Sequence, residues 1–187
     1  MKKKTFVLLL ALVLIAGAAV GGTLAWLTDT TEAVQNTFTT SDIDITLAES
    51  ENLNLQMIPG CTIAKDPKVT VLKDSEKCYL FVKIEKSSNF DTFMTYTVAD
   101  GWTQGDGTDI PSNVWYRTVE ASTTNQEFAV LKDNQVSVLG TVTKADMNGL
   151  TENTYPTLTF TAYASQFSKS NTESFTAAEA WNNVPKA

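Results

Sequence analysis

Three stretches of the chain alternate between apolar and polar residues, which is the pattern of half-buried β-strands. They cover residues 42–47, 78–84 and 157–164. The residues expected on the apolar faces are Ile43, Ile45 and Leu47 in the first, Cys78, Leu80, Val82 and Ile84 in the second, and Leu158, Phe160, Ala162 and Ala164 in the third. The alternation predicts that each strand turns one face toward a core and the other toward solvent.

Weaker strand patterns separate and follow these three. They occupy residues 62–72, 93–98, 114–120, 126–132 and 136–143, with turn-forming pairs such as Pro59-Gly60 and Asn148-Gly149 between them. Short strands at this spacing, rich in threonine, predict an all-β fold, and more specifically a jelly-roll-type antiparallel β-sandwich. No repeat or linker divides residues 41–187, so we expect one domain there.

Two helical segments are expected within this β-rich chain. Thr176 and Glu179 have the spacing of a capping box, which predicts a short C-terminal helix. Phe175 would pack against Ala180, and Trp181 would turn toward the core. A shorter helical turn is expected at residues 144–148.

The first 25 residues have the pattern of an export signal. Three lysines at positions 2–4 precede an uninterrupted apolar run over residues 6–20, and small residues stand at positions 23 and 25. Because this run is shorter than the ~20 residues that span a bilayer, we expect signal peptidase to cleave between Ala25 and Trp26. The alternative is an uncleaved anchor, which would be the chain's contact with a membrane. We divide the chain into a signal peptide (1–25), an N-terminal segment (26–40) and the β domain (41–187).

Composition and charge narrow the function further. The chain has no histidine, which excludes Ser/His/Asp and Cys/His triads and histidine-based zinc sites. Its net charge is −7 and Arg117 is its only arginine, so no basic patch is expected to bind nucleic acid. We therefore expect an acidic exported protein that is not an enzyme and needs no cofactor.

Several short motifs occur in an order and spacing that resemble one known family. They are Gly-Gly-Thr-Leu-Ala-Trp-Leu-Thr-Asp at 21–29, Asn-Thr-Phe-Thr-Thr-Ser-Asp-Ile-Asp-Ile at 36–45, the block from Met57-Ile58-Pro59-Gly60 to Tyr79-Leu80-Phe81-Val82-Lys83-Ile84, and Thr-Ala-Tyr-Ala-Ser-Gln at 161–166 with Ala-Glu-Ala-Trp at 178–181. Together they cover about half the chain and resemble the TasA/camelysin family of Gram-positive bacterial matrix proteins, which carry SipW-type signal peptides. In the second motif the family's usual glycine is replaced by Thr40 or Ser41. The resemblance implies a jelly roll, secretion to the cell surface or extracellular matrix, and assembly into biofilm fibres.

In such fibres the N-terminal segment of one subunit is thought to complete the sheet of the next. The resemblance therefore implies self-association, or association with a homologous matrix subunit. Residues 26–40 suit strand addition because they contain neither glycine nor proline, and Trp26, Leu27, Val34 and Phe38 could fill pockets at an open sheet edge. Head-to-tail addition does not close, so it produces a filament. The residues alone equally allow a disordered tail, or a segment packed on its own domain.

Three aspartates in one glycine-rich loop are weak candidates for a calcium site. Asp100, Asp106 and Asp109 could offer the carboxylate oxygens that hard cations prefer. Their spacing is not that of an EF-hand, and Asp-Gly pairs are common in ordinary turns, so an ordinary loop is the favoured interpretation. Camelysin-like relatives are described as metal-dependent proteases. The absence of histidine disfavours that activity here, and it is kept as an alternative.

Two further hypotheses concern cysteines and aromatic residues. Cys61 and Cys78 form an even pair in an exported protein, which predicts a disulfide contributing about 3 kcal/mol. Against it, a hairpin turning near Asp74 would bring Cys78 opposite a residue near Val71, so two buried thiols are the alternative. The remaining functional alternative is a monomeric carbohydrate-binding β-sandwich. The aromatic residues that could stack on sugar rings are Trp102, Trp115, Tyr116 and Tyr163.

Overall fold

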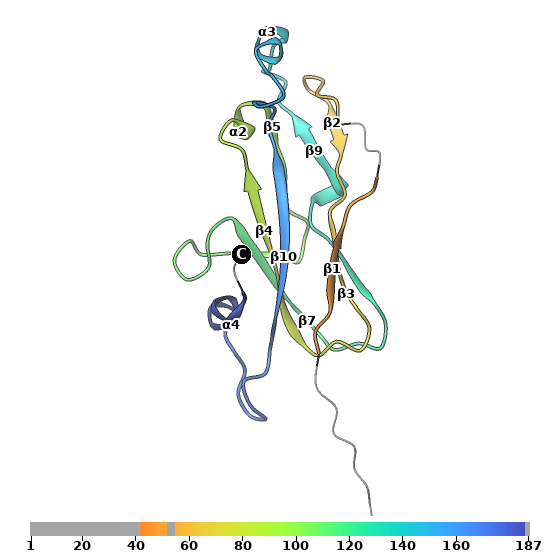
Figure 1. The fold of residues 1–187 in the computed structure, drawn as a ribbon, viewed down its shortest axis with the longest axis vertical. Helices are drawn as coiled ribbons and strands as arrows, with labels where there is room; N and C mark the ends of the chain where they lie inside the picture. The colour runs from red at the N-terminus through yellow and green to blue at the C-terminus, as the bar shows by residue number, and fades with distance from the viewer. Residues whose placement is uncertain (1–41, 52–54, 186–187) are drawn as a thin grey trace, which may run out of the picture. The chain divides into compact units, whose positions relative to one another are not determined.

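The computed structural model describes residues 42–51 and 55–185, and they form a mostly β structure with a few short helices (Figure 1). Its strands make three antiparallel sheets, which confirms the all-β prediction. The predicted signal peptide (1–25), its cleavage point between Ala25 and Trp26, and the N-terminal segment (26–40) lie outside the described residues. Within the described ranges, no helix is both long enough and apolar enough to span a bilayer.

The largest sheet has four strands in the order β10-β4-β7-β6. Its strands are β10 (Leu158–Gln166), β4 (Cys78–Lys86), β7 (Val114–Val119) and β6 (Thr103–Gln104). β4 and β10 pair along their whole length, from Cys78 opposite Gln166 to Lys86 opposite Leu158. Both were predicted from strict alternation, and the four apolar residues predicted to face inward on β4 are all buried.

Two three-stranded sheets contain the remaining strands. One has the order β1-β3-β8, with β1 (Ile45–Ala48), β3 (Lys68–Val71) and β8 (Gln126–Ala129). The other has the order β2-β9-β5, with β2 (Thr62–Ala64), β9 (Gln135–Val138) and β5 (Met94–Thr95). The predicted strand over 62–72 is therefore two strands in different sheets. Between them, Pro67 has no N–H to donate to a ladder, and the Lys65 N–H instead donates to the Asn134 carbonyl.

The helices are short, and two of them begin with a capping box. They are α2 (Phe90–Phe93), α3 (Lys144–Asn148) and α4 (Ala177–Asn183), and a 3₁₀ turn covers Lys132–Asn134. α4 begins with the predicted capping box, in which Thr176 and Glu179 each accept a backbone N–H from the other. Thr143 and Asp146 form the same arrangement at α3. Residues 144–148 were predicted as a helical turn, whereas α2 was not predicted.

The four-stranded sheet is covered on both faces. One face shares a core with the β1-β3-β8 sheet, in which Val69 and Val71 meet Leu80 and Val82. A second cluster, from the β2-β9-β5 sheet and α2, packs against the start of β10 at Leu158 and Phe160. The opposite face is covered by α4, where Trp181, Ala180 and Val184 pack with Phe81, Ile110 and Val114. Successive residues Leu80 and Phe81 are thus both fully buried, because they point to opposite faces of a sheet with two covers.

The inward face predicted for 42–47 is only partly buried. Ile43 and Ile45 pack against the first core cluster, as expected from the alternation. Leu47 lies on the same side of the strand but is 37% exposed. β1 is an edge strand, and Leu47 is not among the residues that pack against the first core cluster.

Candidate functional site

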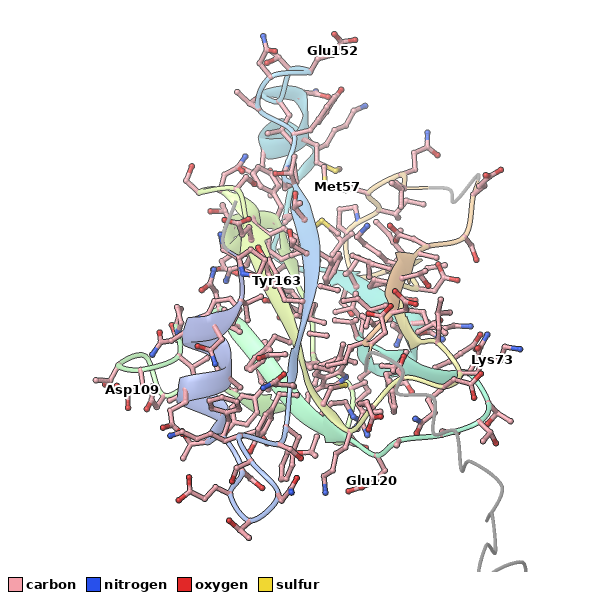
Figure 2. The ribbon with its side chains drawn as sticks, turned by 60° about the horizontal axis from the view of Figure 1, so that its bottom comes forward. Met57, Lys73, Asp109, Glu120, Glu152 and Tyr163 are labelled. Atoms are coloured by element: carbon pink, nitrogen blue, oxygen red, sulfur yellow. The ribbon has the colours of Figure 1, made fainter. Side chains whose placement is uncertain are left out.

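An apolar hollow of about 530 Å³ lies beside the beginning of β10. It is lined by side chains from β2, α2, β10 and the irregular segments around residues 55–57 and 155–157. They include Leu55, Met57, Ile63, Phe90, Tyr155 and Leu158. Met57, one of the lining residues, is labelled in Figure 2. We call this feature the apolar hollow.

Two large apolar side chains at the apolar hollow remain unusually exposed. Leu55 is 57% exposed and Tyr155 is 52% exposed, and nearby Ile58 is 56% exposed. Single exposed apolar residues are common, but a group around a concave apolar surface is typical of an interaction site. The shape and chemistry of the hollow therefore suit an apolar group.

The rim of the apolar hollow is held by backbone and side-chain hydrogen bonds. The Thr157 N–H donates to Ser87 Oγ at 2.9 Å, and the Ser87 N–H donates to the Thr157 carbonyl at 3.0 Å. Asn89 Nδ2 donates to the Thr154 carbonyl at 2.8 Å. These bonds attach the segment before β10 to the end of β4 and so fix Tyr155 beside the hollow.

One cation lines the apolar hollow, and it already has a partner. Lys65 Nζ lies 2.9 Å from Glu49 Oε1 and 5.5 Å from the centre of the Phe160 ring. Its charge is balanced by the carboxylate and its side chain is held over the ring. The hollow is thus better suited to an apolar occupant than to an anion.

β10 also presents a free backbone edge next to the apolar hollow. The Ser87 N–H donates to the Thr157 carbonyl and the Phe167 N–H donates to the Lys77 carbonyl, so odd-numbered residues from 157 to 167 bond to β4. The backbone groups of the residues between them, from Leu158 to Gln166, point away from β4. β10 has no other strand partner among residues 42–51 and 55–185. Such an edge can accept an additional strand.

The aspartate loop is organised by one carboxylate. Asp106 Oδ1 accepts the backbone N–H groups of Thr108, Asp109 and Ile110 at 2.9, 2.9 and 3.1 Å. These hydrogen bonds, that from Thr108 foremost, hold the pKa of Asp106 below its ordinary value. No group of three potential metal-ligating carboxylates or thiols occurs in the part of the chain that the structure describes. The structure thus gives Asp106 a turn-forming role and does not bring Asp100, Asp106 and Asp109 together as ligands.

Part of the predicted loop is a strand. β6 lies within the 100–109 segment and pairs with β7, with Thr103 opposite Tyr116. The sequence pattern missed β6 because two residues are too few to show alternation. Asp109 follows it on an outlying loop (Figure 2).

The predicted Cys61–Cys78 disulfide is wrong for this structure, because both cysteines are free. Cys61 is exposed just before β2, where its carbonyl accepts the Val138 N–H. Cys78 begins β4 in the four-stranded sheet and is buried opposite Val119. The two residues thus belong to different sheets. Burial raises the pKa of the Cys78 thiol to about 11, which keeps it protonated and unreactive.

The aromatic residues considered for sugar binding do not form one platform. Trp102 and Trp115 pack with the first core cluster, and Trp102 Nε1 donates to the Ala129 carbonyl at 2.9 Å. Tyr116 and Tyr163 pack with the cluster beneath α4, on the other face of the sheet. Figure 2 shows Tyr163 on the side of β10 that faces α4. This distribution accounts for all four residues as packing groups.

The residues that form the apolar hollow were missed by the sequence patterns. Leu55 and Met57 belong to an alternating stretch, Asn-Leu-Asn-Leu-Gln-Met at 52–57, which is the one signal that could have identified an apolar surface there. Tyr155 precedes a proline in a segment with turn-forming residues and carries no comparable signal. Comparison of the chain with protein-family models, with curated proteins and with solved structures finds no match.

Proposed function

We propose that this protein is a secreted structural subunit of an extracellular or biofilm matrix. Subunits assemble into fibres when residues 26–40 of one copy add as a strand to the next copy. In this proposal the three sheets act as a β-sandwich of jelly-roll type with one incomplete edge. Secretion and the matrix setting rest on the signal pattern at 1–25 and on the family resemblance.

The free edge of β10 is the observation that carries the proposal. β10 is nine residues long, one of the two longest strands described, and only β4 pairs with it. A long unpaired edge is a liability in a monomeric protein unless something covers it. β1 approaches β10, and the apolar hollow adjoins the beginning of β10 at Leu158. An added strand at that end would gain backbone hydrogen bonds and apolar contacts together.

The proposed donor segment has a pattern that matches such a site. Trp26, Val34 and Phe38 are separated by even numbers of residues, so they would share one face of an extended strand. That face would meet the apolar side of the acceptor, where Phe160 and Leu158 already pack. The same face also carries Thr28, Thr30, Glu32 and Asn36, whereas Leu27 would lie on the opposite face.

The primary test compares two purified forms by electron microscopy. The form that starts at Trp26 is expected to make filaments, and the form that starts at Ser41 is expected to remain monomeric. A synthetic peptide of residues 26–40 should bind the shorter form in a calorimetric titration. Filaments from both forms would rule out strand donation.

A single substitution tests the acceptor edge separately. The Ala162 N–H points away from β4, so Ala162→Pro removes an outward donor without removing a bond of the β4 ladder. We expect this variant to fold, by circular dichroism, but to bind the 26–40 peptide at least about tenfold more weakly. Ala162→Ser, which keeps the N–H, is the matched control and should bind normally. Equal binding by both variants would place the donor elsewhere.

A further inference from the structure

Arg117 occupies an unusual position for the only arginine of an acidic chain. It lies on β7 opposite Leu80 of β4, so its side chain is on the face of the sheet that carries the first core cluster. It is only partly exposed. A charged side chain therefore extends from the margin of an apolar core, beside the edge strands β6 and β8.

Two aromatic rings and one glycine surround the guanidinium. Its Cζ atom lies 4.1 Å from the centre of the Phe128 ring and 5.5 Å from the centre of the Trp102 ring. Gly101 has φ +87°, and a Cβ atom there would lie 3.3 Å from both terminal nitrogens of Arg117. The positive φ favours glycine at position 101, and a side chain there would crowd the guanidinium of Arg117. The two ring contacts and this close turn restrict the movement of the guanidinium.

The charge of Arg117 has no carboxylate partner in the described part of the chain. Six lysines there form ion pairs with Asp or Glu, whereas Arg117 forms none. Its Nε atom is buried without a hydrogen-bond partner. Desolvation lowers the pKa of Arg117, although a guanidinium stays protonated at neutral pH. Cation–π contacts compensate only part of the cost of this partial burial.

We propose that Arg117, held between Phe128 and Trp102, is a receptor for a carboxylate group presented by a second copy of the chain. A guanidinium can donate two parallel hydrogen bonds to a carboxylate. The chain has 21 acidic residues against 14 basic ones, so copies of it present many carboxylates. β10 and β6 are the two edge strands of the four-stranded sheet, and Arg117 lies on β7, next to β6. The proposed carboxylate site therefore lies away from the free edge of β10 and does not depend on strand donation.

Nuclear magnetic resonance can observe this site directly, because one arginine gives one Nε–H signal. Sodium acetate is titrated into the full domain, residues 41–187, at constant ionic strength, and acetamide serves as the neutral control of the same shape. We expect saturable shifts of the Arg117 Nε–H and Gly101 amide signals with acetate and none with acetamide. Equal responses to the two compounds, or no saturable response, would overturn the proposal.

Two variants and a dilution series identify the source of the carboxylate. Arg117→Lys keeps the positive charge but loses the two parallel N–H donors of the guanidinium. We expect this variant to bind acetate about tenfold more weakly, as measured from the Gly101 amide signal. Arg117→Gln should abolish the response, with circular dichroism as the check on folding. If a second copy supplies the carboxylate, the Arg117 signal shifts with protein concentration, and saturating acetate abolishes that concentration dependence. Acetate binding without any concentration dependence would refute the second copy as the source.

Discussion

Replacing Trp181 tests how the outer face of the four-stranded sheet is covered. Trp181 is 5% exposed, and its ring centre lies 5.3 Å from that of Phe81 and 5.5 Å from that of Tyr163. α4 has seven residues, too few to be stable without tertiary contacts. The helix should therefore depend on this side chain for its position.

The expected cost of Trp181→Ala follows from burial and ring contacts. Loss of a buried Trp side chain costs about 3–5 kcal/mol, and the two aromatic pairs argue against the lower end of that range. We expect a loss of about 4 kcal/mol in the free energy of unfolding. With a slope of about 2 kcal/mol per molar urea, the midpoint should fall by about 2 M.

Urea denaturation followed by circular dichroism measures this change. Asn182→Ala is the matched control, because Asn182 is exposed on the same helix and its replacement should change stability by less than about 0.5 kcal/mol. Trp181→Phe should fall between the two. A loss below about 1 kcal/mol for Trp181→Ala would refute the conclusion that α4 is anchored by this residue.

Three further predictions concern the helix cap and the two thiols. Thr176→Ala should cost about 1 kcal/mol in urea unfolding, because the Glu179 N–H loses its hydrogen-bond acceptor. Bonds from Thr176, the backbone N–H first, hold the pKa of Glu179 below its ordinary 4.5, so its contribution is present above pH 4.5 and is lost as the pH falls further. Unfolding measured from pH 7 to pH 3 should show this loss, and Glu179→Gln should make the profile flatter; parallel profiles would contradict it. A thiol reagent at pH 8 should label Cys61 rapidly and Cys78 only after denaturation; no labelling of the native protein would instead indicate a disulfide.

The features that could be predicted from sequence are those set by neighbouring residues. β4 and β10 followed from alternation, because a strand with one face in a core must repeat every two residues. The cap of α4 followed from Thr176 and Glu179, whose hydrogen bonds join residues three apart. Such contacts act within one element, so their spacing is visible in the chain.

The tertiary structure decided what joins distant segments. Burial of Phe81 depends on α4, about 100 residues later, and no local pattern shows that both faces of β4 are covered. The separation of β2 from β3, and with it the free Cys61 and Cys78, depends on which strands pair across the sheets.

The candidate sites depend on the same long-range contacts. The apolar hollow forms where Leu55, Ile63 and Leu158 converge, and Arg117 meets Phe128 and Trp102 only across sheet edges. By itself, the sequence determined the acidic composition without histidine. It also determined the main strands and the capped helix, because these depend on residues near one another in the chain. Only the folded chain decided which edge stays open, because backbone hydrogen bonds between strands carry no sequence signal of their own.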